Sequence, residues 1–445
     1  MTAALFAENV RQLTSTTLRI ATAGSVDDGK STLIGRLLHD TKTVFEDQLA
    51  AVEKASRRYG DGEMNLALLT DGLRAEREQG ITIDVAHRYF ATPQRSFIVA
   101  DTPGHAQYTR NMVTGASNAD VAIVLVDARR GVLEQTRRHA FIASLLGVRT
   151  IVVAVNKMDL VDWDEWVFTS IADEVKAYVA ALNGDVPVYA IPISALDGDN
   201  VVTASDRAPW YQGPALLEWL EAFDRNDAGW STFSPIPASL PPVVEVGARV
   251  AVQRVIRPQG GEHADFRGYA GRLTGGSLRV GDPITVLPVG KTSTVTAILR
   301  HGREIDVAFP GHAVAISLAD DIDIARGDVI VASDGPVEPQ VMEEVVVDAC
   351  WMVDAPLRVG SRWWFKHGTR VGRATVTEVL HRHDLSTLER EPAEELGVND
   401  LGRIRLSLSE PIVADPYHVH HESGRLILID EATNSTAAAA MIATS

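Results

Sequence analysis

The chain has 445 residues, 45% of them hydrophobic and 23% charged, a composition ordinary for a globular protein of roughly two to four domains. With 42 Lys and Arg against 59 Asp and Glu, the formal net charge is −17, which argues against a nucleic-acid-binding protein. The single cysteine, Cys350, is unable to form a disulfide framework or a thiolate metal cage, and it fits a small buried side chain on a strand.

The N-terminus does not predict a signal peptide, because it lacks a basic start and because Glu8 and Arg11 interrupt its apolar residues. No uncharged apolar run approaches the ~20 residues that are needed to span a bilayer. We therefore expect a cytoplasmic protein with no membrane segment.

The first half of the chain alternates short apolar runs with stretches of helical spacing. The apolar runs cover residues 18–23, 97–100, 121–126, 151–155 and 188–193, and the helical stretches cover 32–39, 134–146 and 162–182. Continuous apolar runs of strand length are typical of parallel strands that helices cover on both faces. The pattern predicts a doubly wound α/β domain with a mostly parallel sheet over residues 1–228.

The second half has a different character. Residues 229–242 contain Gly, Ser and four prolines and are predicted to be a linker. Short β-branched runs separated by Gly, Pro and Asp then predict two small β-barrel domains, over 243–335 and 336–432, with a break near 333–340. The Ala-rich tail, 433–445, predicts a short helix or a disordered segment.

A glycine-rich segment between the first predicted strand and helix matches the P-loop pattern G-x-x-x-x-G-K-[ST]. Its backbone amides and the helix N-terminus would cradle phosphates, with Lys30 on the β- and γ-phosphates and Ser31 on Mg²⁺. A chance glycine turn is the alternative, and the flanking strand and helix argue against it. The predicted phosphate-binding residues are Gly24, Ser25, Val26, Asp27, Asp28, Gly29, Lys30, Ser31 and Thr32.

A second segment, Asp101, Thr102, Pro103, Gly104 and His105, follows the apolar run 97–100. The Asp101 carboxylate would hold Mg²⁺ through a water, and Gly104 would let a backbone N–H approach the γ-phosphate. A type I turn after a strand is the alternative, and the position downstream of a P-loop favours the functional interpretation.

A third segment, Asn156, Lys157, Met158 and Asp159, follows another buried run. The Asp159 carboxylate would accept hydrogen bonds from guanine N1–H and the exocyclic amine, a pair of donors that adenine lacks. Asn156 would bridge the P-loop and the base, and the Lys157 stem would pack on the base face. A polar cluster at a strand end is the alternative.

A fourth segment, Ser194, Ala195 and Leu196, follows the run 188–193 and would present the Ala195 N–H to guanine O6. Taken alone this tripeptide is a weak signal. The order of the four segments predicts a GTP-binding and GTP-hydrolysing domain of the Ras type, with GTP and Mg²⁺ bound.

Residues 76–84, E-R-E-Q-G-I-T-I-D, resemble the effector segment of the translation-factor GTPase superfamily. This resemblance implies that Thr82 is a second protein ligand of Mg²⁺ and that His105 orients the attacking water, where Ras-type proteins use Gln. Without the flanking motifs, these residues would be a charged helix end followed by a strand.

The chain also resembles the large, GTP-binding subunit of heterodimeric sulfate adenylyltransferase over nearly its whole length. The similar stretches cover 26–38, 69–73, 79–90, 107–112, 197–202, 210–214, 366–369, 397–400 and 411–417. The resemblance implies that a small, ATP-binding partner subunit forms adenosine 5′-phosphosulfate and pyrophosphate from ATP and sulfate. The large subunit would hydrolyse GTP and couple that energy to the synthesis.

Three features qualify this resemblance. Ala106 stands where the resemblance leads us to expect Glu before Gln107. Some members of the family carry a fused adenylylsulfate kinase domain, but this sequence shows no second P-loop that would predict one. His418, His420 and His421 invite a metal hypothesis, but a solvated loop is favoured because their i, i+2, i+3 pattern lacks acidic or Cys partners of known geometry. The alternatives for function are a GTP-dependent carrier of aminoacyl-tRNA and a regulatory GTPase with neither partner.

Overall fold

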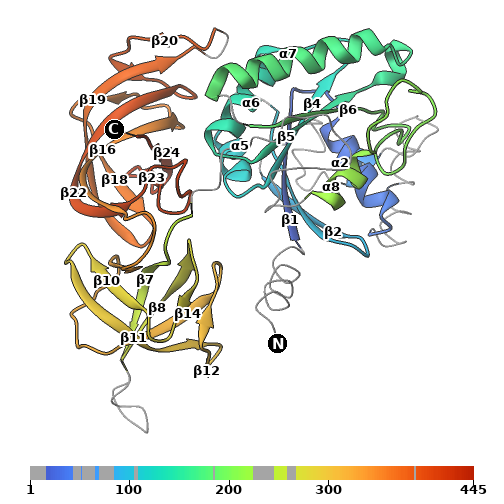
Figure 1. Cartoon of the computed structure of the whole chain (residues 1–445). Coiled ribbons are helices and arrows are strands. Elements are labelled where there is room, and N and C mark those ends of the chain that lie inside the picture. Colours follow the sequence, from blue (N-terminus) through green and yellow to red (C-terminus); the bar gives the residue numbers. More distant parts are fainter. Residues whose placement is uncertain are drawn as a thin grey trace. The chain divides into compact units, whose positions relative to one another are not determined.

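The computed structural model describes residues 17–43, 52, 66–69, 85–104, 109–183, 186–223, 245–257, 267–384 and 387–444 (Figure 1). The chain divides into two compact units, Met1–Pro241 with Leu385–Leu388, and Pro242–Asp384 with Glu389–Ser445. The predicted linker lies outside the described residues, so the domain limits stay predictions. Within the described ranges, no helix is both long enough and apolar enough to cross a membrane.

The first unit is built on a six-stranded sheet in the order β2-β3-β1-β4-β5-β6. Only the β2–β3 pair is antiparallel, and the other neighbours run parallel. The strands are β1 (Thr17–Gly24), β2 (Ala86–Ala91), β3 (Ser96–Asp101), β4 (Val121–Asp127), β5 (Thr150–Asn156) and β6 (Val188–Pro192). Every apolar run of the first half predicted as a strand is one.

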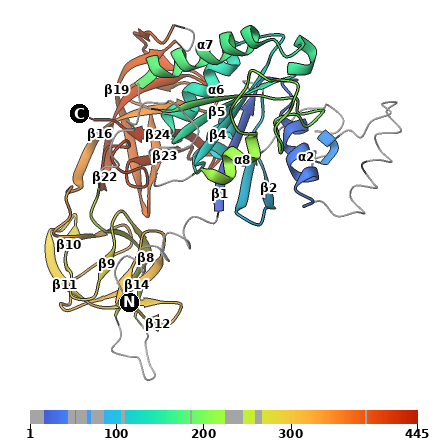
Figure 2. The ribbon, with the colours of Figure 1, turned by 45° about the vertical axis from the view of Figure 1, so that its right-hand side comes forward.

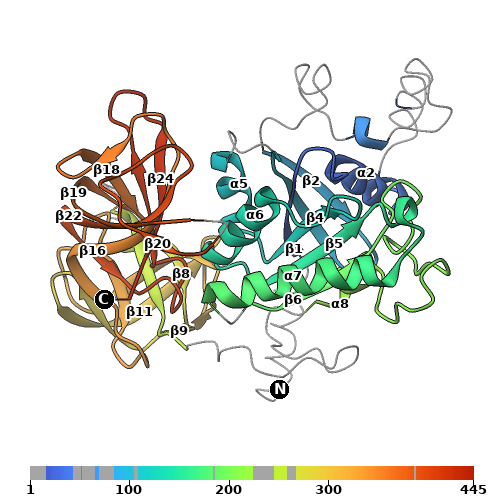
Figure 3. The ribbon, with the colours of Figure 1, turned by 90° about the horizontal axis from the view of Figure 1, so that it is seen from above.

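Helices cover both faces of this sheet, and alternate residues of β4 show how. Ile123 and Leu125 pack in one core with α2 and α8, whereas Val124 and Val126 pack in another with α6 and α7. Figure 3 shows α2 and α7 on opposite sides of the strands. The doubly wound prediction is confirmed. The helices are α2 (Lys30–Asp40), α5 (Thr109–Ala116), α6 (Glu134–Leu145), α7 (Glu165–Asn183) and α8 (Leu216–Ala222), with 3₁₀ turns η1 (Leu66–Leu69) and η3 (Met158–Val161).

Helix α7 begins at Glu165, three residues later than the predicted 162. Asp162 and Trp163 have positive φ angles of 51° and 55°, which a right-handed helix does not allow. The Asp164 carboxylate accepts hydrogen bonds from the backbone N–H of Trp166 (2.7 Å) and Val167 (3.2 Å) and so caps the first turn.

The second unit contains two closed, antiparallel, six-stranded barrels (Figure 2). In the first, the ring β10-β15-β7-β8-β14-β11 closes through the β10–β11 pairing, and β12 extends it. In the second, β18-β23-β24-β16-β22-β19 closes through β18–β19, and β20 extends it. Both predicted barrels are thus confirmed, and closure leaves no unpaired sheet edge in either ring.

The first barrel domain contains strands β7 (Arg249–Ile256), β8 (Gly268–Thr274), β9 (Leu278–Arg279), β10 (Pro283–Leu287), β11 (Lys291–Arg300), β12 (Arg303–Glu304), β13 (Val307–Ala308), β14 (Ala313–Leu318) and β15 (Val329–Ala332), of which β9 and β13 form a separate two-stranded sheet. Those of the second are β16 (Gln340–Trp351), β17 (Leu357–Arg358), β18 (Arg362–His367), β19 (Arg370–His383), β20 (Arg390–Glu391), β21 (Glu395–Leu396), β22 (Leu401–Ala414), β23 (Arg425–Ile429) and β24 (Thr436–Ile442). Cys350 is buried on β16, as predicted.

The prediction of a helical or disordered tail was wrong. Residues 436–442 form strand β24, which pairs with β16 on one side and β23 on the other. Ala437, Ala438 and Ala440 are at most 1% exposed. Small side chains fit this crowded barrel wall, so packing overrides the low strand propensity of alanine.

A buried ion pair joins the two barrels. Arg249 of β7 donates to the Asp415 carboxylate at 2.8 Å, and both side chains are at most 4% exposed. Ser423 also donates to Asp415 and lies 2.7 Å from His420 Nδ1. The prediction of a solvated histidine loop was therefore wrong for His420, which is 8% exposed. Burial lowers the pKa of His420, and among the described residues no three His, Cys, Asp or Glu side chains gather as a metal site.

Candidate functional site

The phosphate-loop segment lies where the sequence predicts it, between the end of β1 at Gly24 and the start of α2 at Lys30. Gly29 has a φ of 93°, and a Cβ there would lie 2.3 Å from Asn156 Nδ2. Gly24 also packs closely, because a Cβ on it would lie 3.1 Å from Leu125 Cβ. The loop conformation therefore requires Gly29 for both its dihedral angle and its close neighbour.

Lys30 and Asp101 form a buried ion pair in this site, with side chains 7% and 3% exposed. Asp101 ends β3, which runs parallel to β1, so the carboxyl ends of the two strands lie at the same edge of the sheet. A Cβ on Gly104 would lie 2.5 Å from the Gly24 carbonyl oxygen. The two motifs are thus in direct contact, with a cation and an anion that compensate each other's burial.

Asp28 is a buried carboxylate inside the loop, 1% exposed. Its Oδ2 accepts a hydrogen bond of 2.7 Å from the Ser25 backbone N–H, whereas its Oδ1 and the Ser25 hydroxyl have no partner within the described residues. Burial raises the pKa of Asp28 to about 6, although the Ser25 N–H and the positive charge of Arg130 oppose this.

Asn156, at the end of β5, joins two motifs that are far apart in sequence. Its Nδ2 donates to the Asp28 carbonyl at 2.7 Å, and its Oδ1 accepts from the Ala195 N–H at 2.9 Å. The predicted bridge to the phosphate loop is therefore present. In this structure the Ala195 N–H, which the sequence assigned to guanine O6, is bonded to Asn156.

Lys157 also reaches the phosphate loop. Its Nζ donates to the Asp27 carbonyl and lies 2.9 Å from the Asp127 carboxylate. Asp127 is held by Arg129 as well, through bonds of 2.7 and 3.0 Å from the guanidinium. Burial alone would raise the pKa of Asp127, but the hydrogen bonds from Arg129 and Lys157 lower it well below its usual range. The sequence reasoning missed Asp127, although it ends β4 just as Asp101 ends β3.

Asp159 lies in η3, where the Met158 N–H donates to the Ile193 carbonyl at 3.2 Å. This bond places the third motif beside the fourth. The fourth motif is a tight turn in which the Asp197 N–H donates to Ser194 Oγ at 3.2 Å and the Gly198 N–H to the Ser194 carbonyl at 2.8 Å.

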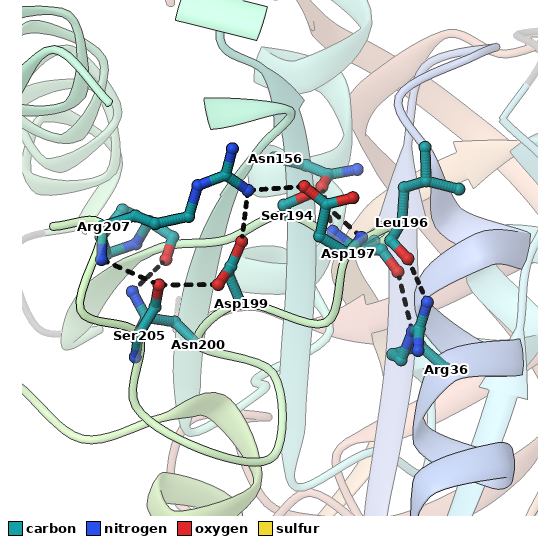
Figure 4. Close-up of polar contacts among 11 residues, drawn as sticks. Arg36, Asn156, Ser194, Leu196, Asp197, Asp199, Asn200, Ser205 and Arg207 are labelled. Carbon is teal, nitrogen blue, oxygen red and sulfur yellow. Dashed lines mark hydrogen bonds and ion pairs between the residues drawn. The ribbon is translucent and has the colours of Figure 1, made fainter. Parts of the chain in front are cut away.

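Two arginines that the sequence reasoning did not single out hold this turn (Figure 4). Arg36 of α2 donates to the carbonyls of Ala195 and Leu196. Arg207 donates to Asp197 at 2.7 Å and to Asp199 at 2.9 Å. Arg36 and Asp197 fall in the stretches that carried the family resemblance, which is the one signal that would have pointed to them.

The structure thus brings together the phosphate loop, the Asp101 turn, the Asn156 motif and the Ser194 turn. Thr82, His105 and Ala106 lie outside the described residues, so their predicted roles stay predictions.

Comparison with known proteins agrees with this architecture. The family model "Elongation factor Tu GTP binding domain" matches residues 15–226, and "GTP-eEF1A C-terminal domain-like" matches residues 344–443. A crystal structure of sup35 complexed with GDP aligns over 97% of this chain and 94% of that chain, at 24% identity and a TM-score of 0.42, which is too low to add to the assignment.

Curated relatives are closer. Sulfate adenylyltransferase subunit 1 of Tolumonas auensis is 49% identical over 427 residues, covering 96% of this chain and 86% of that protein. The bifunctional enzyme CysN/CysC of Mycobacterium tuberculosis is 53% identical over 434 residues, covering 96% of this chain and 67% of that protein. The chain belongs to the sulfate adenylyltransferase subunit 1 family.

Proposed function

We propose that this chain is the GTP-hydrolysing subunit of a sulfate adenylyltransferase. It would couple GTP hydrolysis to the formation of adenosine 5′-phosphosulfate and pyrophosphate from ATP and sulfate, on a small ATP-binding partner subunit. The observation that carries the proposal is the Asn156 bridge, because it bonds both to the phosphate loop and to the turn 194–196, which would meet the base.

The phosphate end of the pocket would use Lys30 and the amides of the loop. The Lys30–Asp101 pair supports this role, since a buried ammonium that is paired with a carboxylate can exchange that partner for phosphate oxygens. The loop residues 24–32 and the turn 101–104 would surround the triphosphate, and the N-terminus of α2 would add its positive dipole end.

The two predicted Mg²⁺ ligands that the structure describes, Ser31 and Asp101, carry oxygen donors that suit this ion. Ser31 supplies a hydroxyl, and Asp101 a carboxylate that would act through a water, both hard oxygen ligands of the kind Mg²⁺ prefers. Thr82 would supply a second hydroxyl. When bound, the ion would neutralise charge on the β- and γ-phosphates.

The base end of the pocket would select guanine through the Asp159 carboxylate. Asn156 and Lys157 bond to the phosphate loop and Met158 bonds to Ile193, the residue after β6, so the turn 194–196 would close this end. A rigid frame of this kind makes a missing hydrogen bond costly, which is how a site distinguishes guanine from adenine.

His105 would position the water that attacks the γ-phosphorus, with release of phosphate and GDP. The carrier of aminoacyl-tRNA stays the alternative function, and the identity of 48–53% to sulfate adenylyltransferase subunits and the bifunctional enzyme favours the sulfate reaction.

The test is to coexpress the chain with a small ATP-binding subunit of this enzyme class and to measure adenosine 5′-phosphosulfate with and without GTP. GTP should raise product formation, and Asp159→Asn should shift this dependence from GTP to xanthosine triphosphate. Because only this chain carries the variant, the shift would locate the coupling nucleotide on it. Product formation independent of either nucleotide, or copurification with tRNA and no partner subunit, would refute the proposal.

A further inference from the structure

We propose that Arg36 is a positioning residue for guanine recognition, acting through the turn 194–196. This inference rests on the proposed function, because it concerns the base end of the same pocket. Arg36 lies on α2, the helix that begins at the phosphate loop, and its guanidinium reaches the turn 160 residues further along the chain.

Two hydrogen bonds define the interaction. Arg36 Nε donates to the Ala195 carbonyl at 3.3 Å, and Nη2 donates to the Leu196 carbonyl (Figure 4). The guanidinium is a planar fork that holds two acceptors in a fixed geometry, which a lysine ammonium does not do. The side chain is 18% exposed, so water screens these bonds only in part.

Because the peptide unit is planar, a hydrogen bond that fixes the direction of a carbonyl also fixes the direction of the N–H in the same peptide unit. In a trans peptide unit the C=O of one residue and the N–H of the next point in opposite directions. Holding the Ala195 carbonyl toward α2 therefore directs the Leu196 N–H away from α2. The Leu196 carbonyl is held likewise, and the Asp197 N–H of that peptide donates to Ser194 Oγ.

The remaining contacts leave the turn little freedom. Asn156 holds the Ala195 N–H, and Gly198 packs against the Arg36 stem, where its Cβ position lies 3.5 Å from Arg36 Cδ. Arg207 holds the far side of the turn through Asp197 and Asp199. Arg36 thus links the turn to the helix that begins at the phosphate loop, and it orients the Leu196 N–H, the donor that guanine O6 would meet.

The experiment compares three nucleotides on Arg36→Met, which keeps the stem and removes the donors, and on Arg36→Lys, which keeps the charge. GTP can make all the proposed contacts of the base. In 6-thio-GTP a sulfur replaces O6 and is a weaker hydrogen-bond acceptor, and inosine triphosphate lacks the exocyclic amine that Asp159 would bind. Equilibrium affinities and dissociation rates are measured by displacement of a fluorescent guanine nucleotide. Arg137→Met is the matched control, since Arg137 lies on α6 and pairs with Glu174.

We expect Arg36→Met to weaken GTP binding by roughly 10-fold, as for lost hydrogen bonds to a charged group, mainly through faster dissociation. The wild-type preference for GTP over 6-thio-GTP should shrink, whereas its preference for GTP over inosine triphosphate should persist. Arg36→Lys should restore part of the affinity, and Arg137→Met should match the wild type.

Unchanged GTP affinity in Arg36→Met, or an equal loss of both preferences, would overturn the inference. The first result would show that the bonds of Arg36 do not affect nucleotide binding, and the second would indicate general damage to the site. A wild-type chain that binds GTP no better than ATP would instead refute the proposed function.

Discussion

The buried carboxyl of Asp28 makes stability depend on pH in a defined direction. Its pKa rises from 3.8 to about 6 on folding, chiefly through burial. At about 1.4 kcal/mol per pKa unit, this corresponds to about 3 kcal/mol. Because the folded protein binds the proton more tightly, this contribution is fully present below pH 3.8 and is lost as pH rises through 6.

Asp28→Asn tests this magnitude, because the amide keeps an oxygen to accept from the Ser25 N–H but does not titrate. The free energy of unfolding of the variant minus that of the wild type should grow by roughly 1.5 kcal/mol between pH 5 and 7.5, and by about 3 kcal/mol over the whole titration.

Hydrogen-exchange mass spectrometry on nucleotide-free protein provides the assay, since the slowest amides of β4 and β5 report unfolding of the first unit separately from the barrels. Asp173→Asn is the control, because Asp173 is an exposed carboxylate on α7. The reasoning would be refuted if the free energy of unfolding of Asp28→Asn minus that of the wild type stayed constant with pH or became smaller as pH rises.

Three further predictions concern other parts of the chain. Asp159→Asn should weaken GTP binding by roughly 10²- to 10⁴-fold and favour xanthine nucleotides in the same displacement assay; an unaltered preference would remove Asp159 from base recognition. His105→Ala should lower single-turnover GTP hydrolysis by roughly 10²- to 10⁴-fold with affinity nearly intact, and normal turnover would assign the water to another group. Arg249→Met should destabilise the barrels by about 3–5 kcal/mol in urea unfolding, because it leaves the Asp415 charge buried. Arg373→Met, which breaks the exposed pair with Glu431, should cost at most about 1 kcal/mol, so equal losses would contradict the argument.

Much of the first unit was predictable because its signals are local. The run 121–126 became β4 (Val121–Asp127) and 151–155 became β5 (Thr150–Asn156). A continuous apolar run fits a strand that is covered on both faces, whatever its neighbours are. The phosphate loop was equally readable, since its glycines and its place before a helix are short-range properties.

Tertiary packing decided the features that local patterns describe poorly. The alanines of 436–442 have weak strand propensity, yet they form β24 because this segment pairs with β16 on one side and β23 on the other and is buried in the barrel wall. His420 belongs to a polar loop by composition, yet it is buried beside Asp415 and Ser423. Both errors come from reading a segment without the partners that enclose it.

The sequence by itself determined the fold class, the two barrels and the motifs of the nucleotide site, because hydrophobic periodicity and glycine placement act over a few residues. Only the tertiary structure decided how those motifs are held together. The bonds from Asn156 to Asp28 and from Arg36 to Leu196 join groups 128 and 160 residues apart. Such contacts depend on strand order and on the path of the chain, which no local pattern specifies.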